Sequence, residues 1–122
     1  LKNNAKHPTA RSDLAKVLWR LGEAEEASEL YEAAYLHEKQ DGVLVSDLTR
    51  FWVSQEAYKR AINVLSAFQA DGNSLTPEMV CMRARILRIQ GDQAGFRKGI
   101  ERCRERGGEL GPTEISVLDN PL

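Results

Sequence analysis

Residues 14–34 read LAKVLWRLGEAEEASELYEAA, which is two apolar stripes at helical spacing separated by a single glycine, Gly22. The first stripe consists of Leu14, Val17, Leu18 and Leu21. The second consists of Ala27, Leu30, Tyr31 and Ala34. Glycine commonly ends a helix because it adopts the left-handed conformation without steric cost. The stretch therefore predicts two short helices that fold back on each other as a hairpin.

The same pattern recurs along the chain. A shift of 34 residues places Leu14 on Leu48 and Ala27 on Ala61, and the helix-breaking residues recur with a similar period at Pro8, Gly42, Pro77 and Pro112. One hairpin cannot bury its apolar faces alone, so such units are stable only when stacked. The expected division is a tail of a preceding repeat at 1–7, repeats at 8–41, 42–76 and 77–111, and the start of a fourth repeat or a capping turn at 112–122.

Residues 14–34 resemble the tetratricopeptide repeat (TPR). That family's order of a large residue, a small residue, a turn glycine, alanine, an aromatic residue and alanine is matched by Leu14, Ala15, Gly22, Ala27, Tyr31 and Ala34. The second unit matches more loosely, because Glu56 stands at the turn glycine and Phe68 at the last alanine. The resemblance covers residues 8–106. It implies an all-α fold, a right-handed superhelical stack of antiparallel helix hairpins that binds protein partners in its concave groove.

In that family the groove is lined by the first helix of each pair. The resemblance therefore implies a partner-binding surface made of Ser12, Lys16, Trp19, Arg20, Ser46, Arg50, Val53, Arg85 and Arg88. One cation recurs per repeat, at Lys16, Arg50 and Arg85, and a row of cations in a concave surface suits an anionic segment. Trp19 would add a rigid anchor. The alternative is solubilising surface, with Trp19 packed against a neighbour.

Motifs for catalysis and for metal binding are missing from the sequence. His7 and His37 have no Cys or Asp partner at ligand spacing, and no serine has a base placed to activate it. The glycine-rich piece at 107–111 is not followed by Lys-Ser or Lys-Thr, so it predicts a helix stop rather than a phosphate loop. We expect no enzymatic activity, no metal and no organic cofactor.

The formal net charge is -1, which argues against bulk electrostatic binding of nucleic acid. The charge is unevenly spread: residues 22–41 hold seven acids and one base, whereas residues 81–106 hold eight bases and three acids. Solvated helix faces are the expected explanation, and a basic ligand-facing surface is the alternative. No apolar run has the roughly 18 residues of a membrane helix, so we expect no membrane insertion by this segment.

Two cysteines, Cys81 and Cys103, cannot form a disulfide framework for 122 residues. Both lie in helical patterns, and we expect buried free thiols, with a bridge between them as the alternative. The degenerate Ala- and Arg-rich repeats suggest a scaffold segment of a bacterial envelope assembly in the periplasm, such as the arrays of exopolysaccharide exporters. Adjoining repeats of the same parent chain would then be partners. The alternative is a cytoplasmic regulatory or chaperone-type TPR module.

Overall fold

The computed structural model describes residues 8–120, which form seven α-helices and no strand. The helices are α2 (Pro8–Arg20), α3 (Ala24–His37), α4 (Gly42–Ser54), α5 (Tyr58–Ala70), α6 (Pro77–Ile89), α7 (Gln93–Glu105) and α8 (Pro112–Asp119). The predicted all-α class is confirmed for this range. The expected tail of a preceding repeat at 1–7, with His7, lies outside the described residues, as do residues 121–122.

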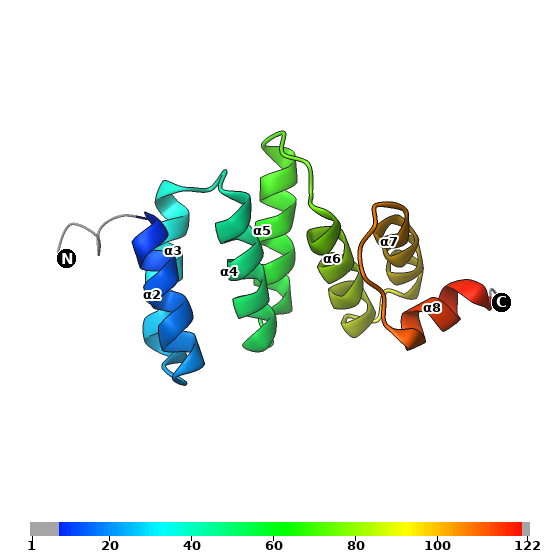
Figure 1. Cartoon of the computed structure of the whole chain (residues 1–122), viewed down its shortest axis with the longest axis horizontal. Helices are drawn as coiled ribbons and strands as arrows, with labels where there is room; N and C mark the ends of the chain where they lie inside the picture. Colours follow the sequence, from blue (N-terminus) through cyan, green and yellow to red (C-terminus); the bar gives the residue numbers. More distant parts are fainter. Residues whose placement is uncertain (1–7, 121–122) are drawn as a thin grey trace.

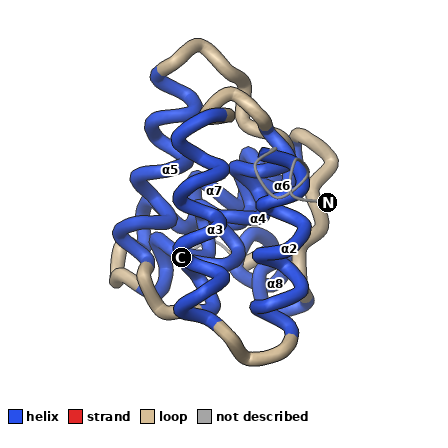
Figure 2. The backbone as a smooth tube through the Cα atoms, turned by 90° about the vertical axis from the view of Figure 1, so that its left-hand side faces the viewer, coloured by secondary structure: helices blue, strands red, loops and turns tan. Residues whose placement is uncertain are grey.

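The helices pair in chain order. The closest packing joins α2 to α3, α4 to α5 and α6 to α7, and the three hairpins follow one another along the long axis of the molecule (Figure 1). Viewed down that axis, α2, α4, α6 and α8 lie toward one side and α3, α5 and α7 toward the other (Figure 2). The first helices of the hairpins thus form one layer and the second helices form the other.

The turn inside each hairpin has one residue in the left-handed region. Gly22 and Gly91 both have φ of +86°, and Glu56, at the equivalent position of the second hairpin, has φ of +59°. The three residues are 34 and 35 positions apart, as in the predicted repeat. A side chain at such a φ is strained, because its Cβ approaches the following carbonyl oxygen.

Glu56→Gly should therefore stabilise the protein by up to about 1 kcal/mol. The variant removes the cost of the left-handed conformation, and part of this gain is offset because glycine raises the conformational entropy of the unfolded chain. The measurement is the urea midpoint of the variant beside that of Gln55→Gly, a neighbouring residue with φ of -91°. Gln55→Gly should lower the midpoint. A lower midpoint for Glu56→Gly as well would contradict the assigned turn.

Thr76 and Asp41 begin two of the first helices. The Thr76 hydroxyl accepts a hydrogen bond from the backbone N–H of Met79 at 3.2 Å, with Pro77 following at the first helical position. The Asp41 carboxylate accepts from the N–H groups of Val43 and Leu44. These caps fix where α4 and α6 start.

Aromatic side chains join the first hairpin to the second. Phe51 on α4 is 1 % exposed, and its ring centroid lies 5.5 Å from that of Trp19 on α2 and 5.1 Å from that of Tyr31 on α3. It also touches Trp52, at 5.1 Å. Large rings here fill the space between hairpins, whereas Ala27, which is fully buried, keeps α2 and α3 close.

Gly99, in the middle of α7, is explained by close helix packing. A Cβ on Gly99 would lie 2.5 Å from the Cβ of Ala84 on α6, so the two helices can approach this closely only with glycine there. Gly95 has a different role, because its N–H donates to the capping carboxylate of Asp92 at 2.8 Å.

The apolar stripe predicted for α2 is not buried along its whole length. Leu14, Val17 and Leu21 are 44 %, 48 % and 70 % exposed, whereas Leu48 and Phe51, the equivalents of Leu14 and Val17 on α4, are each 1 % exposed. The first hairpin covers α4, but no element among residues 8–120 covers the same face of α2. Helical spacing predicts a stripe correctly without saying whether a neighbour covers it.

The prediction of free thiols is wrong, because Cys81 and Cys103 form a disulfide with their Cα atoms 5.0 Å apart. The reason is the symmetry of the hairpin. Each cysteine lies eleven residues from Asp92, in the turn between α6 and α7, and an antiparallel hairpin brings positions equidistant from its turn side by side. Both cysteines are buried, as expected.

Candidate partner-binding groove

A hollow of about 940 Å³ opens between the first helices of the second and third hairpins. Its walls are α4 and α6, and the segment after α7 closes one end. We call this hollow the groove. It is lined by Asp41, Gly42, Val43, Ser46, Asp47, Arg50, Thr76, Pro77, Glu78, Cys81, Arg85, Gly107, Gly108 and Glu109.

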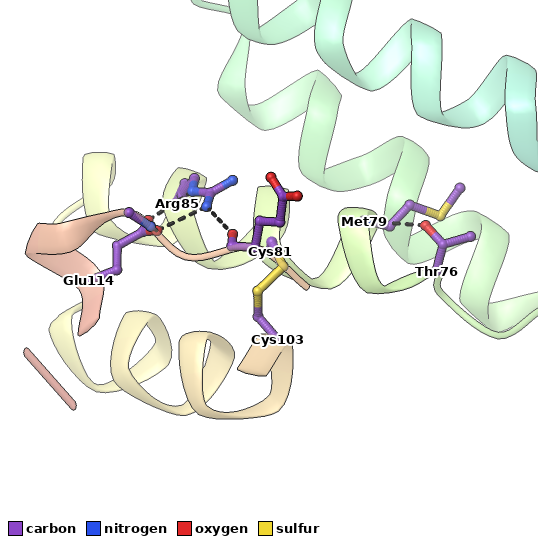
Figure 3. The surroundings of a disulfide bond; sticks show 8 residues. Thr76, Met79, Cys81, Arg85, Cys103 and Glu114 are labelled. Carbon is purple, nitrogen blue, oxygen red and sulfur yellow. Dashed lines mark hydrogen bonds and ion pairs between the residues drawn. A yellow bond between two sulfur atoms is a disulfide. The ribbon is translucent and has the colours of Figure 1, made fainter. Parts of the chain in front are cut away.

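Apart from glycines, three of the residues that line the groove are apolar: Val43, Pro77 and Cys81. Val43 at the start of α4 is 72 % exposed, and Pro77 opens the facing helix. The disulfide from Cys81 lies in the wall, one helical turn from Arg85 (Figure 3). Gly108 packs against both sulfur atoms, and a Cβ at this residue would overlap the Sγ of Cys81 and lie 2.7 Å from that of Cys103.

Ion pairs connect the first helices of successive hairpins. The Lys16 ammonium on α2 lies 3.1 Å from the Asp47 carboxylate on α4. Asp47 also accepts from Arg50 at 2.8 Å, and Arg50 in turn pairs with Glu78 on α6. A chain of alternating charges therefore runs from the first hairpin to the third.

The last pair of the series joins α6 to α8. The Arg85 guanidinium donates to both carboxylate oxygens of Glu114, at 2.8 and 2.9 Å, and to the backbone oxygen of Glu109 at 2.8 Å (Figure 3). Glu114 is only 8 % exposed and also accepts from the Gly111 N–H at 2.9 Å. The hydrogen bond from Arg85 is the main cause that lowers the pKa of Glu114, and the same bond raises the pKa of Arg85.

This pair predicts a pH dependence. Since the pKa of Glu114 is lower in the folded chain, its contribution to stability is complete above its ordinary value of 4.5 and is lost as the pH falls through the lowered value. The unfolding free energy of the wild type should fall between about pH 5 and pH 3 more steeply than that of Glu114→Gln. The same pH dependence of the unfolding free energy in the wild type and in Glu114→Gln would contradict the ion pair. Glu109→Gln is the control, because the Glu109 side chain is exposed and makes no ion pair in the described part of the chain, so this variant should behave like the wild type.

The predicted row of cations exists, but it is not a free positive surface. Lys16, Arg50 and Arg85 each have a carboxylate partner from a following helix. The carboxylate partners Asp47, Glu78 and Glu114 are not at equivalent positions of the repeat. The repeat pattern that predicts the cations therefore does not predict their carboxylate partners. The groove consequently has charges of both signs. Its lining residues include four carboxylates, from Asp41, Asp47, Glu78 and Glu109, and two guanidinium groups, from Arg50 and Arg85.

The predicted groove residues divide into two groups. Ser46, Arg50 and Arg85 line the groove together. The others do not line it: Ser12, Lys16, Trp19, Arg20, Val53 and Arg88. Within this second group, Trp19 packs edge-on against Phe51, as the alternative interpretation has it, and the Arg88 guanidinium lies 5.1 Å from the centre of the Phe96 ring. Val43, Pro77 and Glu109 line the groove without having been predicted.

Two buried hydroxyl groups have no hydrogen-bond partner in the described part of the chain. One is Ser46 Oγ, on a groove-lining residue that is 8 % exposed. The other is the hydroxyl of Tyr31, and burial raises the pKa of this side chain to about 12. Buried hydroxyls are normally hydrogen-bonded, so an unpaired one beside a hollow is available to a ligand after a rotation about its Cα–Cβ bond.

Within residues 8–120, no group of three His, Cys, Asp or Glu side chains is arranged to hold a metal ion, and no helix has the length and apolar character to cross a bilayer. His37 is exposed at the end of α3. Comparison of the chain with protein-family models, curated proteins and solved structures finds no match.

Proposed function

We propose that this chain is a non-catalytic scaffold that binds a segment of a protein partner in the groove, and that its hairpins form a TPR-type right-handed superhelical stack. The observation that carries the proposal is the groove itself. It is a hollow of about 940 Å³ walled by the first helices of two successive hairpins, which is where the TPR resemblance implies that a partner binds.

We propose that the groove is held rigid before a partner binds. Ion pairs tie α4 to α2 and to α6, and the disulfide ties α6 to α7. A rigid surface loses little conformational entropy on binding, so more of the contact energy becomes affinity. The exposed side chain of Val43 offers an apolar contact, and Ser46 Oγ offers a hydrogen bond to a partner backbone.

The charge of the groove bears on the kind of segment. An acidic segment would bind Arg50 or Arg85 only in competition with Asp47, Glu78 and Glu114. We therefore propose that the partner is an extended segment that binds through backbone hydrogen bonds and an apolar side chain. A carboxylate of the partner could bind Arg50 only by displacing the chain's own carboxylates. The affinity for such a partner should depend less on salt concentration than the affinity for an acidic partner, because salt screens interactions between exposed charges.

We also propose that adjoining repeats of the same parent chain cover α2, and that the protein works in an oxidising compartment such as the bacterial periplasm. The exposed Leu14 and Val17 support the first point, since their equivalents on α4 are buried by a preceding hairpin. The disulfide supports the second, because cytosolic thiols are kept reduced. A scaffold of an envelope assembly, such as one for exopolysaccharide export, fits both.

The test uses peptides selected for binding from a displayed random library, with dissociation constants measured by calorimetry. Val43→Glu should weaken binding about tenfold or more by placing an unpaired carboxylate in the groove. Leu36→Glu is the matched control, since Leu36 on α3 is 71 % exposed and does not line the groove. Equal loss in the two variants, or no loss in Val43→Glu, would place the binding surface elsewhere.

A further inference from the structure

A second pocket, of about 330 Å³, lies between α6 and α7. It uses a different face of α6 from the groove: Val80, Arg83, Ala84 and Leu87 line the pocket, whereas Cys81 and Arg85 line the groove. From α7 it is lined by Gly95, Lys98, Gly99, Glu101, Arg102 and Glu105.

The three cations of this pocket have no ion pair in the described part of the chain, unlike the cations of the groove. Arg83 Nη1 donates to the amide oxygen of Gln69 at 3.1 Å, which is a neutral partner. Burial lowers the pKa of Arg83, and the positive charge of Arg102 lowers it further. Arg83 and Arg102 line the same pocket and repel each other, and Lys98 adds a third positive charge.

Stacking of hairpins does not require these charges. At the equivalent positions of the second hairpin, Leu48 replaces Arg83, Asn63 replaces Lys98 and Ala67 replaces Arg102. Leu48 is 1 % exposed and packs in the core, so an apolar residue fills this position where only packing is needed. A half-buried arginine there costs desolvation without a compensating carboxylate.

We propose that Arg83, Lys98 and Arg102 form a binding site for a phosphate group, either free or carried by a ligand. Two guanidinium groups with several unused N–H donors suit the oxygens of a tetrahedral dianion, and a lysine adds a compact charge. A bound dianion relieves the repulsion between Arg83 and Arg102. The carboxylates of Glu101 and Glu105 at the same pocket disfavour large polyanions and limit the site to a single phosphate group.

The experiment is a titration of the ¹⁵N-labelled chain with sodium phosphate at constant ionic strength, followed by two-dimensional amide spectra. The amide signals of Gly95 and Gly99 should move and saturate, while that of Gly22, in the turn of the first hairpin, should stay in place. Arg102→Gln should raise the dissociation constant about tenfold, as expected for the loss of a charged hydrogen bond. Arg106→Gln removes an equal charge outside the pocket and should leave it unchanged.

A second arm distinguishes the source of the phosphate. If O-phosphoserine binds as tightly as inorganic phosphate, the pocket accepts a phosphorylated side chain; if it fails to bind, the site is one for the free ion. Arg83→Gln should also weaken binding, but Arg83 packs between helices, so exposed Arg102 provides the decisive variant. Shifts that never saturate, or an equal effect of Arg106→Gln, would overturn the proposal. The groove variant Val43→Glu should bind phosphate normally, so this test does not depend on the proposed function.

Discussion

Phe51→Ala should destabilise the protein by about 3–5 kcal/mol, a large share of the roughly 5–15 kcal/mol available to a domain of this size. Phe51 is 1 % exposed and contacts Trp19, Tyr31 and Trp52, so its removal leaves a cavity between the first two hairpins. The measurement is urea unfolding followed by circular dichroism. Phe51→Leu, which keeps most of the volume, should cost less than half as much.

The pattern of unfolding is as informative as its size. A stack of hairpins is stabilised by contacts between neighbours, so loss of the Phe51 cluster should loosen the first hairpin before the third. Hydrogen exchange should then show faster exchange in α2 and α3, with α6 and α7 still protected by their disulfide. An unchanged urea midpoint, or uniform loss of protection, would contradict this account of how the hairpins are joined.

Removal of the disulfide should cost roughly 3 kcal/mol, the entropy of closing a loop with a sequence separation of 22. For a chain of 122 residues this corresponds to a melting temperature lower by about 10 °C. The comparison is between the oxidised wild type, the wild type with a thiol reductant and the double variant Cys81→Ser/Cys103→Ser. The reduced wild type and the double variant should melt at similar temperatures.

Two controls make the disulfide prediction decisive. The double variant should be insensitive to reductant, and thiol titration of the unfolded, unreduced wild type should find no free thiol. One or two thiols per chain would show that Cys81 and Cys103 are not bonded. Gly108→Ala should also lower the melting temperature, because the added Cβ would overlap the Cys81 sulfur.

What the sequence by itself determines here is the local architecture. Helical spacing of apolar residues and the turn residues Gly22 and Gly91 predict the hairpins. The recurring residues Pro8, Gly42, Pro77 and Pro112 are the first residues of α2, α4, α6 and α8. These signals act within a helix or across one tight turn, so the physical cause and its effect lie within a few residues of each other. The repeat pattern alone also places Glu56 at the position of the turn glycine, although it does not show that Glu56 has a positive φ.

The tertiary structure alone decides which side chains meet across hairpins. Asp47, Glu78 and Glu114 neutralise the cations that the sequence suggests for the groove, because helices some 30 residues apart in the chain pack side by side. Leu14 is exposed where its equivalent is buried, because burial depends on a neighbouring hairpin rather than on spacing. The disulfide and the unpaired cations of the second pocket likewise depend on the distance between α6 and α7. The packing of Ala84 against Gly99 sets that distance.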